Sequence, residues 1–436
     1  MSSISRRGLG VWFAAVIYYL YQYILRVSPG VMVDDLMLAF NLDAQSLGYL
    51  VAITTFFYAL AQLPVGIVAD LFGARKMILY SLAACIVGVA AVAWTENLTV
   101  AFIGRALIGT GSAAGFVCVS KIASEWFPVS QKALWLALTV LMGTLGAMLG
   151  YAPLARLTQA VGWRDSLSYL TWLGVAAFIL NILLLKDRSR ITAQIVDRQK
   201  IVQQIKDVLM SRFAWMYALT ALGMYLPISV FADLWGVSFL TLKYGFSKET
   251  AASILSLSYL GTCGGVIFIA LASNLLKGPR LLIGISAALV TTLMATLVFM
   301  PTLSPMTISV LLITLGVLVG TEILCFSKAC QENDISVAAT VTGFLNFVVT
   351  IGAAFIQQLV GVVLKWLWDG QINDVGLPIY GVQDYQAALS LVILVSFSSF
   401  ILAFFLKEKI PPLKDKTRKL NFAIVLTGRL HGQTPC

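Results

Sequence analysis

The sequence predicts an all-α integral membrane protein of twelve transmembrane helices, arranged as two six-helix halves. Its 436 residues are 59% hydrophobic and only 11% charged, whereas soluble globular proteins carry about 25% charged residues. Apolar runs of about 20 residues recur along the chain, each long enough to cross roughly 30 Å of hydrocarbon as a helix. A charge-rich interruption after the sixth run divides the spans equally.

The expected spans follow one another at short intervals. They lie near residues 9–31, 46–70, 77–95, 99–124, 133–157, 166–185, 213–241, 250–275, 281–300, 306–330, 337–365 and 384–406. The chain therefore divides into a terminal segment 1–8, a first half 9–185, a central loop 186–212, a second half 213–407 and a tail 408–436.

The central loop and the ends of two spans add detail to this division. Residues 195–210 place apolar side chains at helical spacing, which predicts an amphipathic helix on the membrane surface. The segment around Asp70, at the end of the second span, weakly resembles the one around Asn274, at the end of the eighth. We therefore expect the two halves to be pseudo-symmetric.

Basic residues are distributed unevenly between the two sides of the expected membrane. Cytoplasmic loops are enriched in Lys and Arg. If the N-terminus lies inside, most of the 30 Lys and Arg fall on the inner side, whereas the outer loops collect Asp34, Asp35 and Asp43. We therefore expect an inner (plasma) membrane protein with both termini in the cytoplasm. The net charge of +10 is then a topology signal, and no nucleic acid partner is expected.

The residues needed for most enzyme sites are scarce. The single histidine, His431, lies in the tail, and the six cysteines form no Cys-x-x-Cys pair. A glycine-rich phosphate loop followed by lysine is also missing from the sequence. We therefore expect no enzyme activity, no cofactor and no metal site. A membrane sensor is the alternative outside transport, although neither end is long enough to form a soluble output domain.

Charged side chains occur inside four of the spans, where an ionised group costs several kcal/mol unless it faces a partner or a wet cavity. Residues three, four or seven apart share one face of a helix, which extends each charge into a polar stripe. We expect these stripes to line one central substrate site, formed by Tyr19, Gln22, Arg26, Arg105, Ser112, Tyr225, Asp233, Glu322, Asn346 and Gln357.

The charges within this set suggest a division of labour between the halves. Arg26 and Arg105 belong to the first half, and a guanidinium group grips carboxylate or phosphate in a bidentate way. Asp233 and Glu322 belong to the second half, where burial disfavours the charged form of a carboxyl group. We expect an anionic or zwitterionic substrate held by the arginines, with Asp233 or Glu322 carrying a coupling proton.

The most specific string in the sequence is Gly66-x-x-x-Asp70-x-x-Gly73-x-Arg75-Lys76. Its glycines permit a tight turn between two helices and close approach of neighbouring spans. Asp70 is placed to accept hydrogen bonds from the N-terminus of a facing helix and to pair with Arg75. We expect a charged cytoplasmic gate that holds the halves together and breaks when they rock apart.

This string resembles the signature of the major facilitator superfamily between its second and third spans, although Leu71 replaces the usual basic residue. Arg105-Ala-Leu-Ile-Gly109-Thr-Gly111 resembles the fourth-span motif of the same family. Arg26-Val-Ser-Pro29, Asp233-Leu-Trp235-Gly236 and Thr342-Gly343-Phe344 resemble a narrower branch, the phagosomal transporters of intracellular bacteria and the lysosomal dipeptide transporters.

The resemblance implies a secondary active transporter that works by alternating access. We expect proton-coupled uptake of an amino acid, a short peptide or a nucleoside by a monomer in the lipid bilayer. An importer of organic acids or siderophores, and an efflux pump for drugs or metabolites, are the alternatives within transport.

Overall fold

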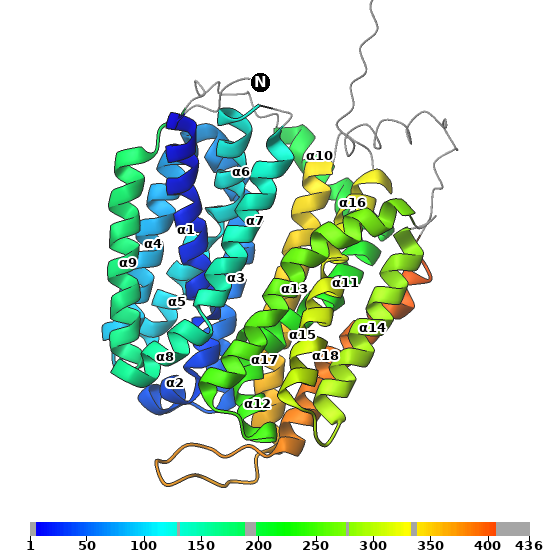
Figure 1. Cartoon of the computed structure of the whole chain (residues 1–436). Coiled ribbons are helices and arrows are strands. Elements are labelled where there is room, and N and C mark those ends of the chain that lie inside the picture. Colours follow the sequence, from blue (N-terminus) through cyan, green and yellow to red (C-terminus); the bar gives the residue numbers. More distant parts are fainter. Residues whose placement is uncertain (1–5, 129–130, 188–197, 276–278, 333–337, 407–436) are drawn as a thin grey trace, which may run out of the picture.

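The computed structural model describes residues 6–128, 131–187, 198–275, 279–332 and 338–406. Within these ranges the chain is almost entirely helical, apart from an antiparallel bridge between Ile372 and Pro378. Eleven helical segments are long and apolar enough to cross a membrane. A further long helix, α13, has 28 residues and lies among them in Figure 1, which fits the expected twelve-helix fold.

The helices of the first half are α1 (Arg6–Val31), α2 (Val33–Phe40), α3 (Ala44–Phe72), α4 (Ala74–Trp94), α5 (Leu98–Ser112), α6 (Ala114–Trp126), α7 (Lys132–Leu149), α8 (Ala152–Val161) and α9 (Trp163–Leu184). The central loop contains α10 (Arg198–Met210). The helices of the second half are α11 (Arg212–Leu226), the π-helix η2 (Pro227–Trp235), α12 (Gly236–Tyr244), α13 (Lys248–Leu275), α14 (Pro279–Phe299), α15 (Pro305–Val319), α16 (Glu322–Glu332), α17 (Ala338–Leu367) and α18 (Val382–Ala403).

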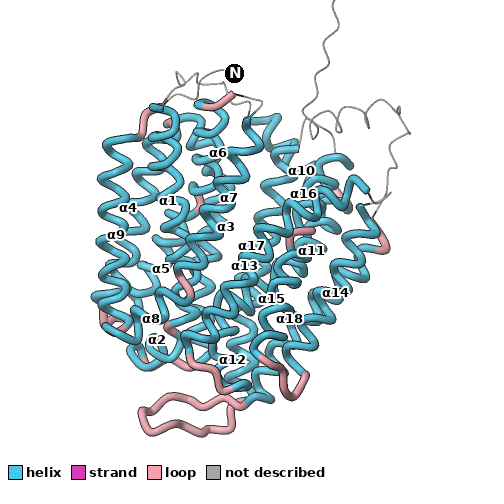
Figure 2. Tube along the Cα trace, viewed as in Figure 1, coloured by secondary structure: helices cyan, strands magenta, loops and turns pink. Residues whose placement is uncertain are grey.

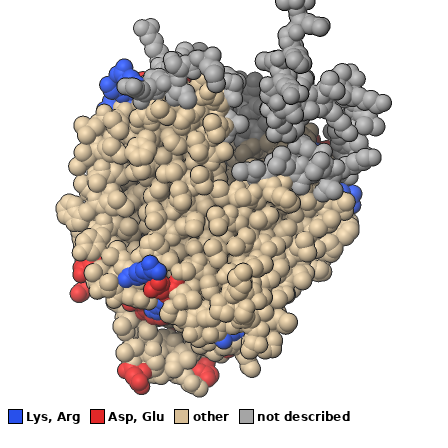
Figure 3. Space-filling model, viewed as in Figure 1, with Lys and Arg blue, Asp and Glu red and all other residues tan. Residues whose placement is uncertain are grey.

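The two halves lie side by side, and their helices diverge toward the end marked N in Figure 1. The loops gather at the two ends of the helices, as Figure 2 shows. In Figure 3 a broad belt without charged side chains separates charged groups at the two ends. This belt has the character that lipid contact requires, since ionised groups are costly in hydrocarbon.

The halves meet closely at the end that carries α2, α8 and residues 368–381, which we call the sealed end. A side chain at Gly30 of α1 would place its Cβ 2.5 Å from the backbone oxygen of Asp233 in η2. Gly48 of α3 abuts the backbone of Gln358 in α17, and Gly361 of α17 abuts Ala44. Small residues let backbones approach closely inside a membrane, so this glycine seam brings the halves into direct contact.

Ion pairs also join the halves at the sealed end. The Arg156 and Glu249 side chains lie 2.6 Å apart, Lys248 and Asp34 lie 2.9 Å apart, and Lys365 and Asp43 lie 2.7 Å apart. These pairs are partly exposed, and exposed pairs contribute about 0–1 kcal/mol each.

A hydrogen bond supplements these pairs where α3 begins. The hydroxyl of Tyr380, in the loop after α17, accepts from the backbone N–H of Ala44 at 3.0 Å. It therefore satisfies one of the free backbone donors that every helix start presents.

The pKa values of two aspartates at the sealed end are shifted by burial and by neighbouring side chains. Burial alone would raise the pKa of Asp43, but hydrogen bonds from Lys365 and Ser46 outweigh it and lower that pKa from 3.8. Burial raises the pKa of Asp35, against the attraction of Lys248 and with the repulsion of Asp34.

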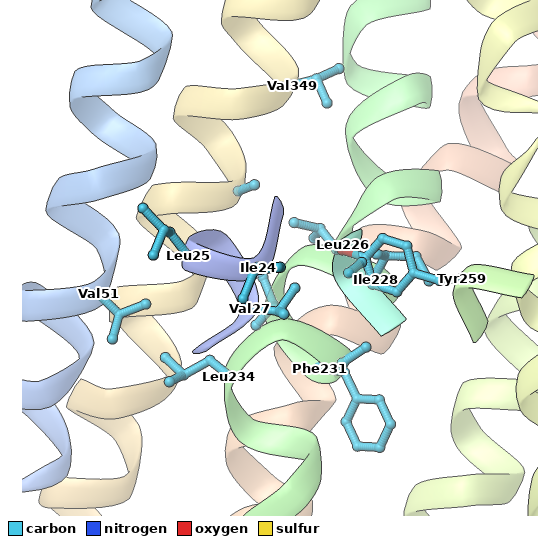
Figure 4. Close-up of a cluster of buried hydrophobic side chains, with 14 of the residues drawn as sticks. Ile24, Leu25, Val27, Val51, Leu226, Ile228, Phe231, Leu234, Tyr259 and Val349 are labelled. Atoms are coloured by element: carbon cyan, nitrogen blue, oxygen red, sulfur yellow. The ribbon is translucent and has the colours of Figure 1, made fainter. Parts of the chain in front are cut away.

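The apolar core continues across the halves at the level where α1 meets η2. Ile24, Leu25 and Val27 of α1 are each at most 4% exposed. Figure 4 shows them beside Leu226, Ile228, Phe231 and Leu234 from the second half, which are also buried. The polar site described next therefore lies among buried apolar side chains.

Candidate substrate site

A local change of helix type places Asp233 at the boundary between the halves. Proline lacks a backbone N–H, and Pro227 stands at the first position of η2, where the chain widens from α-helix to π-helix. π-Helical turns are rare and occur frequently at functional sites. Asp233 lies within η2 and is only 4% exposed, so its carboxylate must find partners inside the protein.

Asp233 finds four donors, drawn from both halves. Arg26 of α1 donates to its Oδ2 through Nε at 3.2 Å and through Nη2 at 3.1 Å. Its Oδ1 accepts from the hydroxyls of Tyr259 at 2.8 Å and Tyr151 at 3.3 Å. Tyr151 lies between α7 and α8 and Tyr259 lies on α13, so this one carboxylate ties four helical segments together. We call these four residues the central latch.

The side chain of Arg26 is more exposed than that of Asp233. Its side chain is 28% exposed, whereas that of Asp233 is 5% exposed. Nη2 of Arg26 also donates to the hydroxyl of Tyr225, and its guanidinium carbon lies 5.7 Å from the ring centre of Tyr23 and 5.5 Å from that of Tyr225. The aromatic faces favour the positive charge, and the exposed part of the group is free to meet an anion.

Glu322 belongs to the second half, at the first position of α16. The helix is interrupted just before it, between α15 and α16, where Gly320 lies against the backbone of Gly265 in α13. Glu322 is half-buried and interacts electrostatically with Arg26 and Tyr225. Among the described residues, no hydrogen bond or ion pair engages its carboxylate. The site therefore contains one acid that is fully occupied and one that is unoccupied.

Tyr19 and Gln22 lie on α1, within the two turns that precede Arg26. The hydroxyl of Tyr19 lies 3.4 Å from that of Tyr23, and its ring packs against Gly143 of α7 and Gly115 of α6. Gln22 also packs against Gly115 and is 4% exposed. Asn346 is half-buried on α17. Tyr19 and Gln22 are thus buried within the first half, on the helix that carries Arg26.

Three of the expected site residues lie elsewhere. Arg105 is 5% exposed and faces a small cavity inside the first half. Ser112 donates to the backbone oxygen of Ile108 at 2.7 Å, on its own helix. Gln357 donates to the backbone oxygen of Ser229 at 3.1 Å, which fastens α17 to η2. In this conformation none of the three joins the polar cluster around Arg26.

Tyr151 and Tyr259 were not singled out in the sequence, although both bind Asp233. A tyrosine in a span is usually explained by packing, so its presence carries little signal. The sequence did indicate that such donors must exist, because a buried carboxylate accepts several hydrogen bonds and one arginine leaves some of its lone pairs unsatisfied.

The expected cytoplasmic gate is described only in part. Gly73 has a φ of +86° and ends α3, and Lys76 is exposed on α4. The backbone N–H of Arg75 donates to Asp187 at 3.0 Å, and its side chain donates to the backbone oxygen of Ile182 at 3.4 Å. Asp187, just after α9, therefore caps the start of α4. The surroundings of Gly66 and the side chain of Asp70 lie outside the described set, so the gate between the halves stays a prediction.

Membrane-crossing helices arranged in two halves, with a charged cluster between them, are an architecture typical of secondary transporters. The chain belongs to the Major Facilitator Superfamily, whose family profile matches residues 11–356. It is therefore a multi-pass membrane protein of that superfamily.

Two bacterial relatives give context for the substrate. The hexuronate transporter of Bacillus subtilis is 23% identical over 264 residues, which cover 58% of this chain and 60% of that protein. A probable L-galactonate transporter of Escherichia coli is 26% identical over 193 residues, which cover 43% of this chain and 41% of that protein. In each case the chain matches less than two thirds of the relative's length.

A solved structure agrees with the fold over nearly the whole chain. The bacterial homolog of the human lysosomal transporter Spinster, in an inward-facing and unoccupied conformation, superposes with a TM-score of 0.75 at 13% identity. The superposition covers 93% of this chain and 98% of that one. At this identity the likeness concerns the fold.

Proposed function

We propose that the chain imports a small carboxylate-bearing metabolite across the inner membrane, coupled to protons, with Arg26 as the anchor for the carboxylate. The observation that carries this proposal is the 28% exposure of the Arg26 side chain within a network that is otherwise buried. Guanidinium is suited to carboxylate recognition. The matched relatives are named for hexuronate and L-galactonate, which are both carboxylates.

The substrate carboxylate and Asp233 compete for the same guanidinium group. When substrate binds, Arg26 divides its donors between two anions, and the central latch between the halves weakens. A ligand shifts a conformational equilibrium by as much as its affinities for the two states differ. Competition for Arg26 supplies such a difference, since the latch joins α1 to η2 across the boundary.

Glu322 is the proposed proton carrier. Its carboxylate faces the site, whereas the carboxylate of Asp233 is occupied by four donors. A proton on Glu322 would offset the charge of an anionic substrate as both enter together. Asp233 would then act as the fixed counter-ion of Arg26 instead of as a titrating group.

Two substrate classes fit, and Glu322 separates them. An amino acid, a short peptide or another zwitterion needs an acceptor for its ammonium group, and Glu322 is the unoccupied carboxylate opposite Arg26. A sugar acid needs no such acceptor. If Glu322 binds an ammonium group, Glu322→Gln weakens substrate binding. If it carries the proton, Glu322→Gln leaves binding intact and removes the dependence of uptake on the proton gradient.

The test combines thermal-shift screening with transport. Purified protein is screened against sugar acids, amino acids, dipeptides and nucleosides, because a ligand stabilises the state that it binds. Uptake of each hit is then measured in proteoliposomes with and without a proton gradient, using Glu322→Gln and the exposed Glu96→Gln as a matched control. If Arg26→Gln keeps the wild-type thermal shift and uptake, the anchor is wrong. If wild-type uptake ignores the gradient, the coupling is wrong.

A further inference from the structure

Arg105 of α5 is a buried cation without a counter-charge in the described part of the chain. Its residue is 5% exposed, and its Nε is enclosed without a hydrogen-bond partner. Among the described residues, none accepts a hydrogen bond from its guanidinium group or forms an ion pair with it. The hydroxyl of Thr54 donates to the backbone oxygen of Arg105 at 3.0 Å and does not reach its guanidinium group.

Tight packing holds α5 in this orientation. Gly104 lies against the backbone of Gly88 in α4, and Gly109 lies against the backbone of Thr54 in α3. Gly111 lies against Ser81 in α4. Contacts this close leave no room for α5 to rotate, so Arg105 points into the first half and away from the central latch.

Arg105 is one of the residues that line a small cavity inside the first half. Residues from α1, α3, α4 and α9 line it, including Ser28, Leu50, Val89 and Leu167. Its volume is about 20 Å³. Roughly 10–15 Å³ suffices for one water-sized particle, so the cavity has room for a single atom of that size and is too small for a sugar acid or an amino acid.

The positive charge of Arg105 decides whether a water molecule or an anion suits the cavity better. An isolated ion in a low-dielectric interior costs several kcal/mol, even after relaxation, unless it is paired. A water molecule would accept a hydrogen bond from Arg105 but would leave the positive charge uncompensated. The hydroxyl of Ser28 already donates to the backbone oxygen of Leu25 at 3.0 Å, which Pro29 leaves without its usual helical donor. Arg105 is thus the main source of donors in an otherwise apolar pocket.

We propose that Arg105 binds one small monovalent inorganic anion of the halide class inside the first half. The site is separate from the substrate site, because Arg105 lines a cavity inside the first half, whereas Arg26 lies at the boundary between the halves, paired with Asp233. A bound anion would neutralise Arg105 and hold α1, α3, α4, α5 and α9 together. It would therefore act as a structural ion whose presence stabilises the first half.

The experiment measures thermal unfolding of the full chain in detergent. Chloride is titrated against gluconate at constant total salt, with bromide and sulfate as further arms. Chloride and bromide should raise the unfolding midpoint in a saturable way, by at least about 2 °C. Gluconate and sulfate, which are too large for the cavity, should have no such effect.

Three variants assign the effect to the cavity. Arg105→Gln removes the charge and should abolish the chloride dependence. Val89→Leu narrows the cavity while retaining Arg105, and it should weaken the dependence. Arg26→Gln changes the arginine of the substrate site and should keep the dependence, so failure of this proposal and failure of the proposed substrate site are distinguishable.

Two results would overturn the proposal. One is a wild-type midpoint that is equal in chloride and gluconate. The other is an Arg105→Gln variant that retains the chloride effect. If Arg105→Gln does not fold, anomalous diffraction from wild-type crystals grown in bromide decides the question: a bromide peak beside Arg105 supports the site, and its absence excludes it.

Discussion

The central latch predicts an asymmetry between two substitutions that break the same ion pair. Arg26→Gln leaves Asp233 as an orphan charge that is 4% exposed, with only Tyr151 and Tyr259 as donors. Asp233→Asn leaves Arg26 as the orphan, but the Arg26 side chain is 28% exposed and can be solvated. Removing one partner of a buried pair costs about 3–5 kcal/mol. We expect about that loss for Arg26→Gln and roughly half of it for Asp233→Asn.

The assay is the free energy of unfolding in mixed micelles, measured for wild type, both single variants and the double variant. The double variant removes both charges, so it should be less destabilised than the sum of the singles by about 2 kcal/mol or more, as expected for residues in direct contact. Phe13→Ala, an exposed position on the same helix, serves as a control and should change little. Additive single effects, or a greater loss for Asp233→Asn than for Arg26→Gln, would refute the assigned latch.

Three further predictions concern the latch and the sealed end. Tyr259→Phe removes a donor 2.8 Å from Asp233 and should lower the free energy of unfolding by about 1.5–3 kcal/mol, whereas Tyr151→Phe, at 3.3 Å, should cost less; equal losses would contradict the geometry. Because the pKa of Asp43 is lowered from 3.8, its ion pair with Lys365 should stabilise the sealed end above pH 3.8 and should lose this effect as the pH falls through the lowered pKa. Fluorescence quenching of a dye attached at the sealed end would report the loss. Asp43→Asn should abolish the pH dependence in this range. Gly30→Val forces a side chain onto the backbone of Asp233 and should expose the sealed end to a membrane-impermeant thiol reagent at an introduced cysteine, whereas unchanged labelling would show that the contact does not hold the halves together.

Hydropathy was sufficient to predict the helical fold, because a span must satisfy its backbone within itself and be apolar over a fixed length. The breaks within spans were less accessible. η2 begins at a proline, but other prolines, such as Pro64 and Pro29, lie inside continuous α-helices. Whether a proline causes a π-turn or a bend depends on which neighbour donates a hydrogen bond to the freed carbonyl oxygen, and the sequence does not contain that information.

The sequence predicted the part of the candidate site in which two opposite charges, buried within spans, must pair with each other. A buried arginine and a buried aspartate on the first and seventh spans were expected in one cavity, and Arg26 and Asp233 do meet. Arg105 could not be placed in the same way, because the orientation of α5 is set by Gly104, Gly109 and Gly111 packing on α3 and α4. Backbone contacts of this kind outweigh the preference of one side chain, and a helical wheel does not reveal them.

The glycine seam determines how the sealed end responds to salt concentration and to membrane thickness. Its contacts are made by backbone atoms and carry no net charge, while the ion pairs around it are wet and weak. High and low ionic strength should therefore leave the sealed end almost equally closed. Thinning or thickening the surrounding lipid, which tilts whole helices, is the disturbance to which such a seam would yield.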